Sequence, residues 1–175
     1  AIGALWKHMS SYDTVQLRDC SVTQLAPLVL VLKTQEARES LSNALESLSL
    51  LQPNIQTCAR LFSGMNAYVM NEYDYDKRLD SYASLTPDCW KELLSNDCSS
   101  VIIYQCCIDL SNQSDISLRH SSARALENLL IASSGNEGSI AVLKRVLMPE
   151  IRLKLVSPSL TVRQEHLECI RKISL

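Results

Sequence analysis

Hydrophobic and polar positions follow each other along this chain with the period of helices. The clearest segment begins behind Thr34, where apolar side chains recur every three or four residues: Ala37, Leu41, Ala44, Leu45 and Leu48. Thr34 suits a helix cap, and Glu36 places a negative charge in the first turn, where the helix dipole favours it. The charged and polar side chains of this segment are expected on its solvent side: Arg38, Glu39, Asn43 and Glu46.

Similar patterns, separated by short breaks, predict helices over residues 22–32, 55–65, 76–85, 117–133 and 139–156, and from 160 to at least 174. Residues 1–10 are typical of the end of an earlier helix. Thr86, Pro87 and Asp88 suit the start of a further helix, and Pro149 is expected to bend or split its own. The apolar residues 99–110 fit a buried helix or a strand, and the helical context favours the helix. Residues 66–75 have no clean period and indicate an elaborated connection.

A helical pattern also returns at an interval of 44 residues. Residues 117–130 align with 161–174, so that Ala123, Leu126 and Leu129 fall on Leu167, Ile170 and Ile173. The same offset brings Leu79, Tyr82 and Leu85 onto the first three. Helical units repeated at this spacing are typical of an α-solenoid of the HEAT or armadillo type. We therefore expect an all-α fold: a single solenoid fragment of a longer chain over residues 1–175, with approximate units 1–66, 67–112, 113–156 and 157–175.

Composition supports this helical interpretation. Apolar residues make up 46% of the chain, and four glycines are too few for the tight turns of a sandwich or barrel. Seven cysteines, an odd number at mostly apolar helix positions, indicate a reducing, intracellular setting in which Cys acts as a small hydrophobic residue. No apolar run reaches the roughly 18 residues of a membrane span, so no membrane partner is expected.

The net charge of −2 conceals an asymmetry. Residues 1–118 hold 8 basic and 14 acidic side chains, whereas residues 119–175 hold 9 basic and 5 acidic ones. Blocks of opposite sign suggest different partners at the two ends of an elongated molecule. Scatter over solvated helix faces would give the same totals.

The sequence contains little that could perform chemistry. Three histidines make no convincing active site, and the glycine motifs that bind nucleotide phosphates are absent. His166 and Cys169 form an i, i+3 pair, but zinc requires four ligands at set spacings. We therefore expect a protein that is not an enzyme and has no cofactor, no metal and no small-molecule substrate.

One candidate for partner contact is acidic and aromatic: Glu72, Tyr73, Asp74, Tyr75 and Asp76. On a protein docking surface, the tyrosines would supply buried area and the acids would steer the partner. In the alternative interpretation, Asp74 or Asp76 caps the following helix while the tyrosines pack over it.

The other candidate is a basic set: Lys144, Arg145, Arg152, Lys154, Arg171 and Lys172. On one face, these side chains would suit RNA phosphates or an acidic partner. In the alternative, several of them pair with Glu150, Glu165 and Glu168. Arg163 stands where such repeats often carry a basic residue that links one repeat to the next.

The acidic stretch also carries a resemblance. The element Met65-Asn66-Ala67, followed by Glu72, Asp74, Tyr75, Asp76, Arg78 and Leu79, resembles a segment of the very large HEAT-repeat protein family of the small-subunit processome, also called down-regulated in metastasis. In that family, a Leu- or Met-Asn-Ala element precedes an acidic Glu-x-Asp-aromatic-Asp-x-Arg-Leu element that enters a helix. The resemblance implies a nucleolar scaffold that wraps around the pre-ribosomal particle, and it implies no catalytic residues.

We therefore expect a non-catalytic scaffold in small-subunit ribosome biogenesis and pre-rRNA processing, located in the nucleolus or nucleus. Its expected partners are other protein subunits of a large complex and pre-ribosomal RNA. Two alternatives stay open. One is a HEAT-repeat scaffold or adaptor in another intracellular complex, such as a transport receptor or a phosphatase or kinase regulator, with a cytoplasmic location. The other is a helical enzyme or regulatory domain whose repeats arise by chance.

Overall fold

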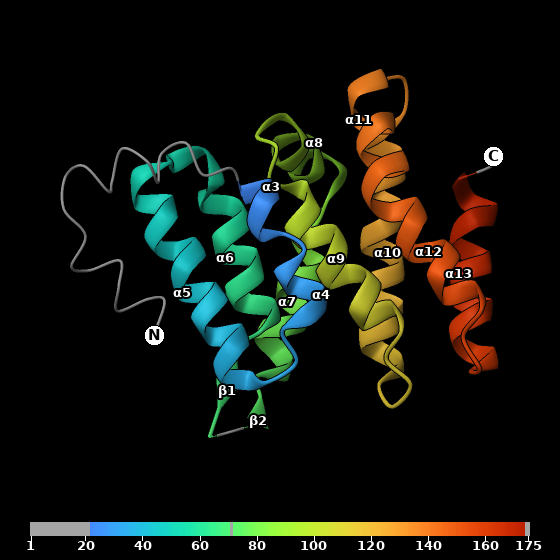
Figure 1. Cartoon of the computed structure of the whole chain (residues 1–175), viewed down its shortest axis with the longest axis horizontal. Helices are drawn as coiled ribbons and strands as arrows, with labels where there is room; N and C mark the ends of the chain where they lie inside the picture. Colours follow the sequence, from blue (N-terminus) through green and yellow to red (C-terminus); the bar gives the residue numbers. More distant parts are fainter. Residues whose placement is uncertain (1–21, 71, 174–175) are drawn as a thin grey trace.

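The computed structural model of the chain describes residues 22–70 and 72–173. The described helices stand side by side along the long axis of the molecule, from α5 at one end to α13 at the other (Figure 1). The fold is an all-α helical repeat with one small antiparallel hairpin in the described part. Its elements are α3 (Val22–Leu25), α4 (Leu28–Val31), α5 (Gln35–Leu51), η1 (Pro53–Ile55), α6 (Gln56–Met65), β1 (Tyr68–Val69), β2 (Glu72–Tyr73), α7 (Tyr75–Ala83), α8 (Pro87–Ser95), α9 (Ser99–Leu110), α10 (Ile116–Ser133), α11 (Glu137–Val142), η2 (Leu143–Leu147), α12 (Met148–Leu155) and α13 (Leu160–Ile173).

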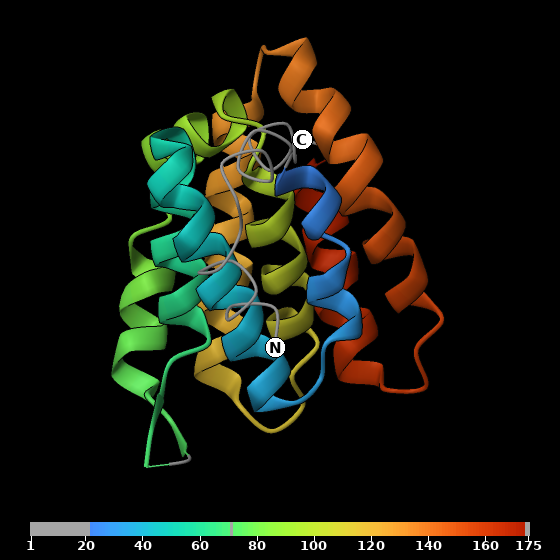
Figure 2. The ribbon, with the colours of Figure 1, turned by 60° about the vertical axis from the view of Figure 1, so that its left-hand side comes forward.

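Helix α9 lies at the centre because its sequence is apolar on nearly every side. Only Tyr104 and Ile108 of this helix are partly exposed. A helix without a polar face must be covered all round, and α9 packs against α3, α4, α6, α8, α10, η2, α12 and α13. Figure 2 shows the two short helices α3 and α4, which Pro27 separates, beside α9. The expected helix over 99–110 is confirmed.

The helices that share the 44-residue interval are neighbours. Helix α10 packs against both α7 and α13. The aligned side chains Tyr82 and Leu126 are buried in the core, and Ile170 packs against it. Leu167, which aligns with Ala123, is 55% exposed because no helix of the described part covers that side of α13. The sequence interval thus corresponds to a translation from one helix to the next along the long axis.

An arginine stands four residues after the capping residue of four of these helices. Thr34, Asp74 and Asp115 cap α5, α7 and α10 through their side chains, and the Ser159 hydroxyl accepts a hydrogen bond from the Val162 N–H at the start of α13 (3.4 Å). The arginines are Arg38, Arg78, Arg119 and Arg163, of which the first three are buried.

Three of these arginines donate hydrogen bonds to backbone carbonyls in the connection that precedes their own helix. Arg38 Nε donates to the Leu32 carbonyl (2.8 Å), Arg119 Nη1 to that of Asn112 (2.9 Å) and Arg163 Nη1 to that of Ser157 (2.6 Å). The expectation that Arg38 faces solvent is therefore wrong. The salt bridge between neighbouring units is made instead by Arg119 and Glu165, at 3.7 Å.

Two local features differ from the sequence prediction. Residues 66–75 are not merely a connection, since they contain the hairpin of β1 and β2, in which Tyr68 pairs with Tyr73. Pro149 does not split its helix, which continues from Glu137 to Leu155 through α11, η2 and α12. Proline lacks the N–H that would bond to the carbonyl four residues earlier, and the π-helical turn at Leu143–Leu147 directly before it absorbs this mismatch.

The helix end expected over residues 1–10 lies outside the described residues. Among the described helices, none is both long enough and apolar enough to cross a membrane.

Candidate functional site

The acidic stretch forms the second strand of the hairpin and the first turn of α7. The rings of Tyr68 and Tyr73 stack with centroids 4.3 Å apart, and the guanidinium of Arg78 lies 3.9 Å from the centre of the Tyr73 ring. Such stacking and cation–π contacts hold the hairpin against α7. The hairpin projects beyond the ends of the helices (Figure 1). At its tip, Met70 is 94% exposed and adopts a left-handed backbone conformation, with φ of 50°.

The structure divides the five acidic and aromatic residues between two roles. Asp74 accepts a hydrogen bond from the Lys77 N–H (3.1 Å) and caps α7. The Tyr75 hydroxyl donates to Asp115 (3.1 Å) and so joins the starts of α7 and α10. Capping by Asp74 is therefore confirmed. Glu72 and Asp76 are exposed and form no salt bridge with the described residues.

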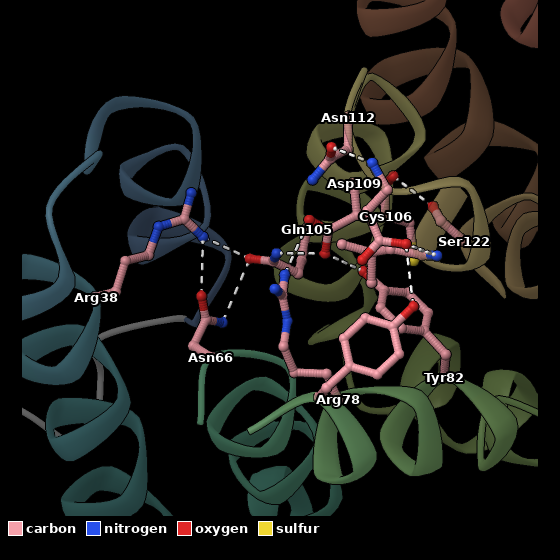
Figure 3. Close-up of polar contacts among 12 residues, drawn as sticks. Arg38, Asn66, Arg78, Tyr82, Gln105, Cys106, Asp109, Asn112 and Ser122 are labelled. Carbon is pink, nitrogen blue, oxygen red and sulfur yellow. Dashed lines mark hydrogen bonds and ion pairs between the residues drawn. The ribbon is translucent and has the colours of Figure 1, made fainter. Parts of the chain in front are cut away.

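A buried polar network links α7, which follows the hairpin, to the core helix α9 (Figure 3). Its centre is Asp109 of α9, which accepts hydrogen bonds from Arg78 Nη2 (3.2 Å), Gln105 Nε2 (2.8 Å) and the Tyr82 hydroxyl. Burial raises the pKa of the Asp109 carboxyl, whereas the charge of Arg78 and the hydrogen bonds from Tyr82 and Gln105 oppose that rise.

The same network reaches α5 and α6 through Gln105. Gln105 Oε1 accepts hydrogen bonds from Arg38 Nη1 and from Asn66 Nδ2 (3.4 Å), and Arg38 Nη2 donates to the carbonyl of Val29 (2.8 Å). Burial lowers the pKa of Arg38. Perturbed pKa values often mark catalytic groups. Here Asp109 is 4% exposed and accepts from three protein donors, so the network stabilises the fold and is closed to a substrate.

The basic residues whose side chains are described lie in different surroundings. Lys144 and Arg152 border the same groove, whereas Arg145 is exposed but does not line that groove. Lys154 is half-buried. Arg171 pairs with Glu168 on α13 at 2.6 Å, and this is one of the ion pairs that the sequence suggested. The side chain of Lys172 lies outside the described part.

A groove lies next to Lys144 and Arg152. It encloses about 870 Å³ between the C-terminal end of α10 and the continuous helix α11–η2–α12. Its lining is mainly apolar: Leu130, Ile131, Ile140, Leu143, Met148 and Pro149. Sequence reasoning missed this groove, although Ile140, Lys144, Met148 and Arg152 recur at intervals of four residues.

The remaining candidates for chemistry lie in the core. Burial raises the pKa of the Cys106 and Cys107 thiols, which disfavours the thiolate that nucleophilic attack or metal binding requires. His166 Nδ1 lies 2.7 Å from the Val162 carbonyl and so carries the hydrogen, while Nε2 has no hydrogen-bond partner in the described part. Among the described residues, no three His, Cys, Asp or Glu side chains are grouped to hold a metal.

Comparison with known proteins gives one match. The family model described as U3 small nucleolar RNA-associated protein 20, N-terminal, matches residues 2–159. This range reaches from before α3 to the connection after α12. No curated protein and no solved structure matches the chain.

Proposed function

The chain belongs to the family of the N-terminal part of U3 small nucleolar RNA-associated protein 20, and from this we propose that it is a non-catalytic structural component of the small-subunit processome. In this role, it supports pre-rRNA processing in the nucleolus by holding other subunits on a HEAT-like helical-repeat surface. The observation that carries the proposal is the family match over residues 2–159.

The arrangement of the helices supports a scaffold role. Each helical unit buries its apolar side against the next, so the outer faces of the helices are left for partners. The polar network around Asp109 is buried, and Asp109 accepts hydrogen bonds from Arg78, Gln105 and Tyr82, which suits a support for binding surfaces better than a reaction centre.

The acidic hairpin is the first proposed protein contact. We define it as residues 68–76. Met70 at its tip and the carboxylates Glu72 and Asp76 face solvent, while Tyr73 and Asp74 hold the hairpin in place. A projection with an apolar tip and acidic sides suits a basic subunit of the particle.

Pre-ribosomal RNA is the second proposed partner. Residues 119–175 carry the basic excess of the chain, and Arg145 is exposed there, outside the groove beside Lys144 and Arg152. Contacts with phosphates would be electrostatic and would weaken with salt.

The test is purification of the tagged chain from the nuclei of cells that express it. We expect enrichment of U3 small nucleolar RNA and of unprocessed small-subunit rRNA over an unrelated abundant nuclear RNA. Depletion of the protein should make the same precursor accumulate. Recovery without U3 RNA, together with transport cargo or a phosphatase or kinase subunit, would instead favour an adaptor in another complex.

A further inference from the structure

We propose that the groove beside Lys144 and Arg152 binds an acidic amphipathic helix of a partner protein. The groove is defined by the C-terminal end of α10 and by the continuous helix α11–η2–α12. The inference rests on the proposed scaffold function in one respect only, namely that the chain acts by binding other proteins.

The packing of α13 shows why a helix fits this groove. Helix α13 packs against both α10 and α12. No described residue of α13 lines the groove, which lies between the end of α10 and α11–η2–α12. The groove is thus bounded by α10 and α12, the same two helices against which α13 packs.

The floor of the groove is suited to the apolar face of such a helix. Ile131 on α10 is 59% exposed and Ile140 on α11 is 37% exposed, and Met148 lies further along the same wall. The wall from Ile140 to Arg152 is about 18 Å long at 1.5 Å per residue. This length accepts roughly three turns of a partner helix, whose apolar side chains would recur at i, i+4 and i+7.

The π-helical turn aligns the contact residues on this wall. In a regular α-helix, residues spaced by four drift about 40° per step around the axis. A π-helical turn contains more residues per turn, so the stretch Leu143–Leu147 reverses part of that drift. As a result Ile140, Lys144, Met148 and Arg152 border one groove.

The charges of the groove select the partner. Lys144 and Arg152 are exposed, and neither forms a salt bridge with the described residues. No carboxylate is among the described side chains that line the groove. The two basic residues lie eight positions apart, which is about 12 Å along the helix, so they match acidic residues two turns apart on the partner.

These observations favour a protein helix over RNA. An RNA backbone requires continuous positive charge, whereas this groove has a mainly apolar floor and two basic side chains. Among the other basic residues of the region, Arg145 is exposed but does not line the groove, Lys154 is half-buried and Arg171 is paired with Glu168. An apolar floor bordered by unpaired basic groups is complementary to a helix with leucines on one face and glutamates beside them.

The test uses the purified chain and a fluorescent, stapled helical peptide of roughly 16 residues, with leucines spaced i, i+4, i+7 and i+11 and flanking glutamates. Binding is measured by anisotropy. We expect Ile131→Glu, a change at an exposed position, to weaken binding at least about tenfold. We expect Lys144→Glu with Arg152→Glu to weaken it to a similar extent and to create binding to a matched peptide with lysines in place of glutamates. Arg60→Glu, at an exposed position on α6, is the matched control and should bind as the unchanged chain does.

Three results would overturn the proposal: no binding of the glutamate peptide, binding that Ile131→Glu leaves unchanged, or a short single-stranded RNA that displaces the peptide and binds more tightly with steep salt dependence. Circular dichroism of each variant excludes loss of fold as the cause. Because purified components are used, failure here leaves the recovery of U3 RNA from nuclei as a separate test of the proposed function.

Discussion

The strongest stability prediction concerns Asp109 at the centre of the buried network. Replacement by Leu leaves the guanidinium of Arg78, whose side chain is only 7% exposed, without its carboxylate. Removing one partner of a buried ion pair costs about 3–5 kcal/mol, because the other charge stays buried and uncompensated. A domain of this kind is stable by about 5–15 kcal/mol in all, so Asp109→Leu should remove about a fifth of its stability or more. Urea unfolding followed by circular dichroism measures the loss through the midpoint, at unchanged m.

A second substitution separates the charge effect from the loss of packing. In Arg78→Met with Asp109→Leu, the buried charge of Arg78 is removed together with its partner, so the double variant should be more stable than Asp109→Leu alone. It should not regain full stability, because the Tyr82 hydroxyl loses its acceptor, at about 1–3 kcal/mol. If the two single losses simply add in the double variant, Arg78 and Asp109 are not coupled and the reasoning is refuted.

An exposed pair provides the control. Lys91 and Asp88 lie 2.9 Å apart, closer than the 3.2 Å between Arg78 and Asp109, but their side chains are 62% and 90% exposed. Exposed ion pairs contribute about 0–1 kcal/mol because water and salt screen them. We expect Asp88→Asn to shift the urea midpoint only slightly, since burial and not distance decides the size of the effect.

Three further outcomes are expected. Leu126→Ala should cost about 2–5 kcal/mol in the same urea assay, because Leu126 is fully buried between neighbouring units, and a loss below about 1 kcal/mol would contradict the assigned packing. Gly64→Ala should be destabilising by about 1–3 kcal/mol, since the new Cβ would lie 2.1 Å from the Ser81 hydroxyl oxygen, and Ser81→Ala should relieve most of that loss; equal losses in both backgrounds would argue against close approach of α6 and α7. Burial lowers the pKa of His166, so the unfolded chain takes up a proton at this residue more readily than the folded chain does. The contribution of His166 to the free energy of unfolding is therefore complete above about pH 6.5 and falls as the pH drops below that value. Thermal unfolding at several pH values should show a smaller loss on acidification in His166→Leu than in the unchanged chain, and equal losses would exclude this role.

The sequence predicts the features that depend only on neighbouring residues, such as helix caps and apolar stripes. Thr34 and Thr86 cap helices through their hydroxyls as expected, at 3.3 Å from the N–H groups of Ala37 and Cys89. The apolar stripe that includes Leu41 and Leu48 is buried. These features are local, because a cap or a stripe depends on residues within a few turns.

Features that depend on distant partners could not be predicted in the same way. Arg38 was placed on the solvent side because it is charged, but its partner Gln105 is 67 residues away. The missed signal was positional: an arginine recurs four residues after the cap in α5, α7, α10 and α13. The hairpin was missed because each strand has only two residues, too few to show a period of two.

The same distinction explains why the acidic hairpin could be recognised from the sequence, whereas the groove could not. The acidic hairpin is one continuous stretch, so its charges and tyrosines were visible together before any fold was known. The groove combines Ile131 from α10 with Ile140 and Met148 from the following helix, so it is formed only when the two helices pack together. In a helical repeat, a connection between helices can be recognised from sequence, whereas a groove between helices requires the packing. Partner sites of the second kind should therefore be sought where unpaired basic or acidic side chains border an apolar gap between units, as Lys144 and Arg152 do here.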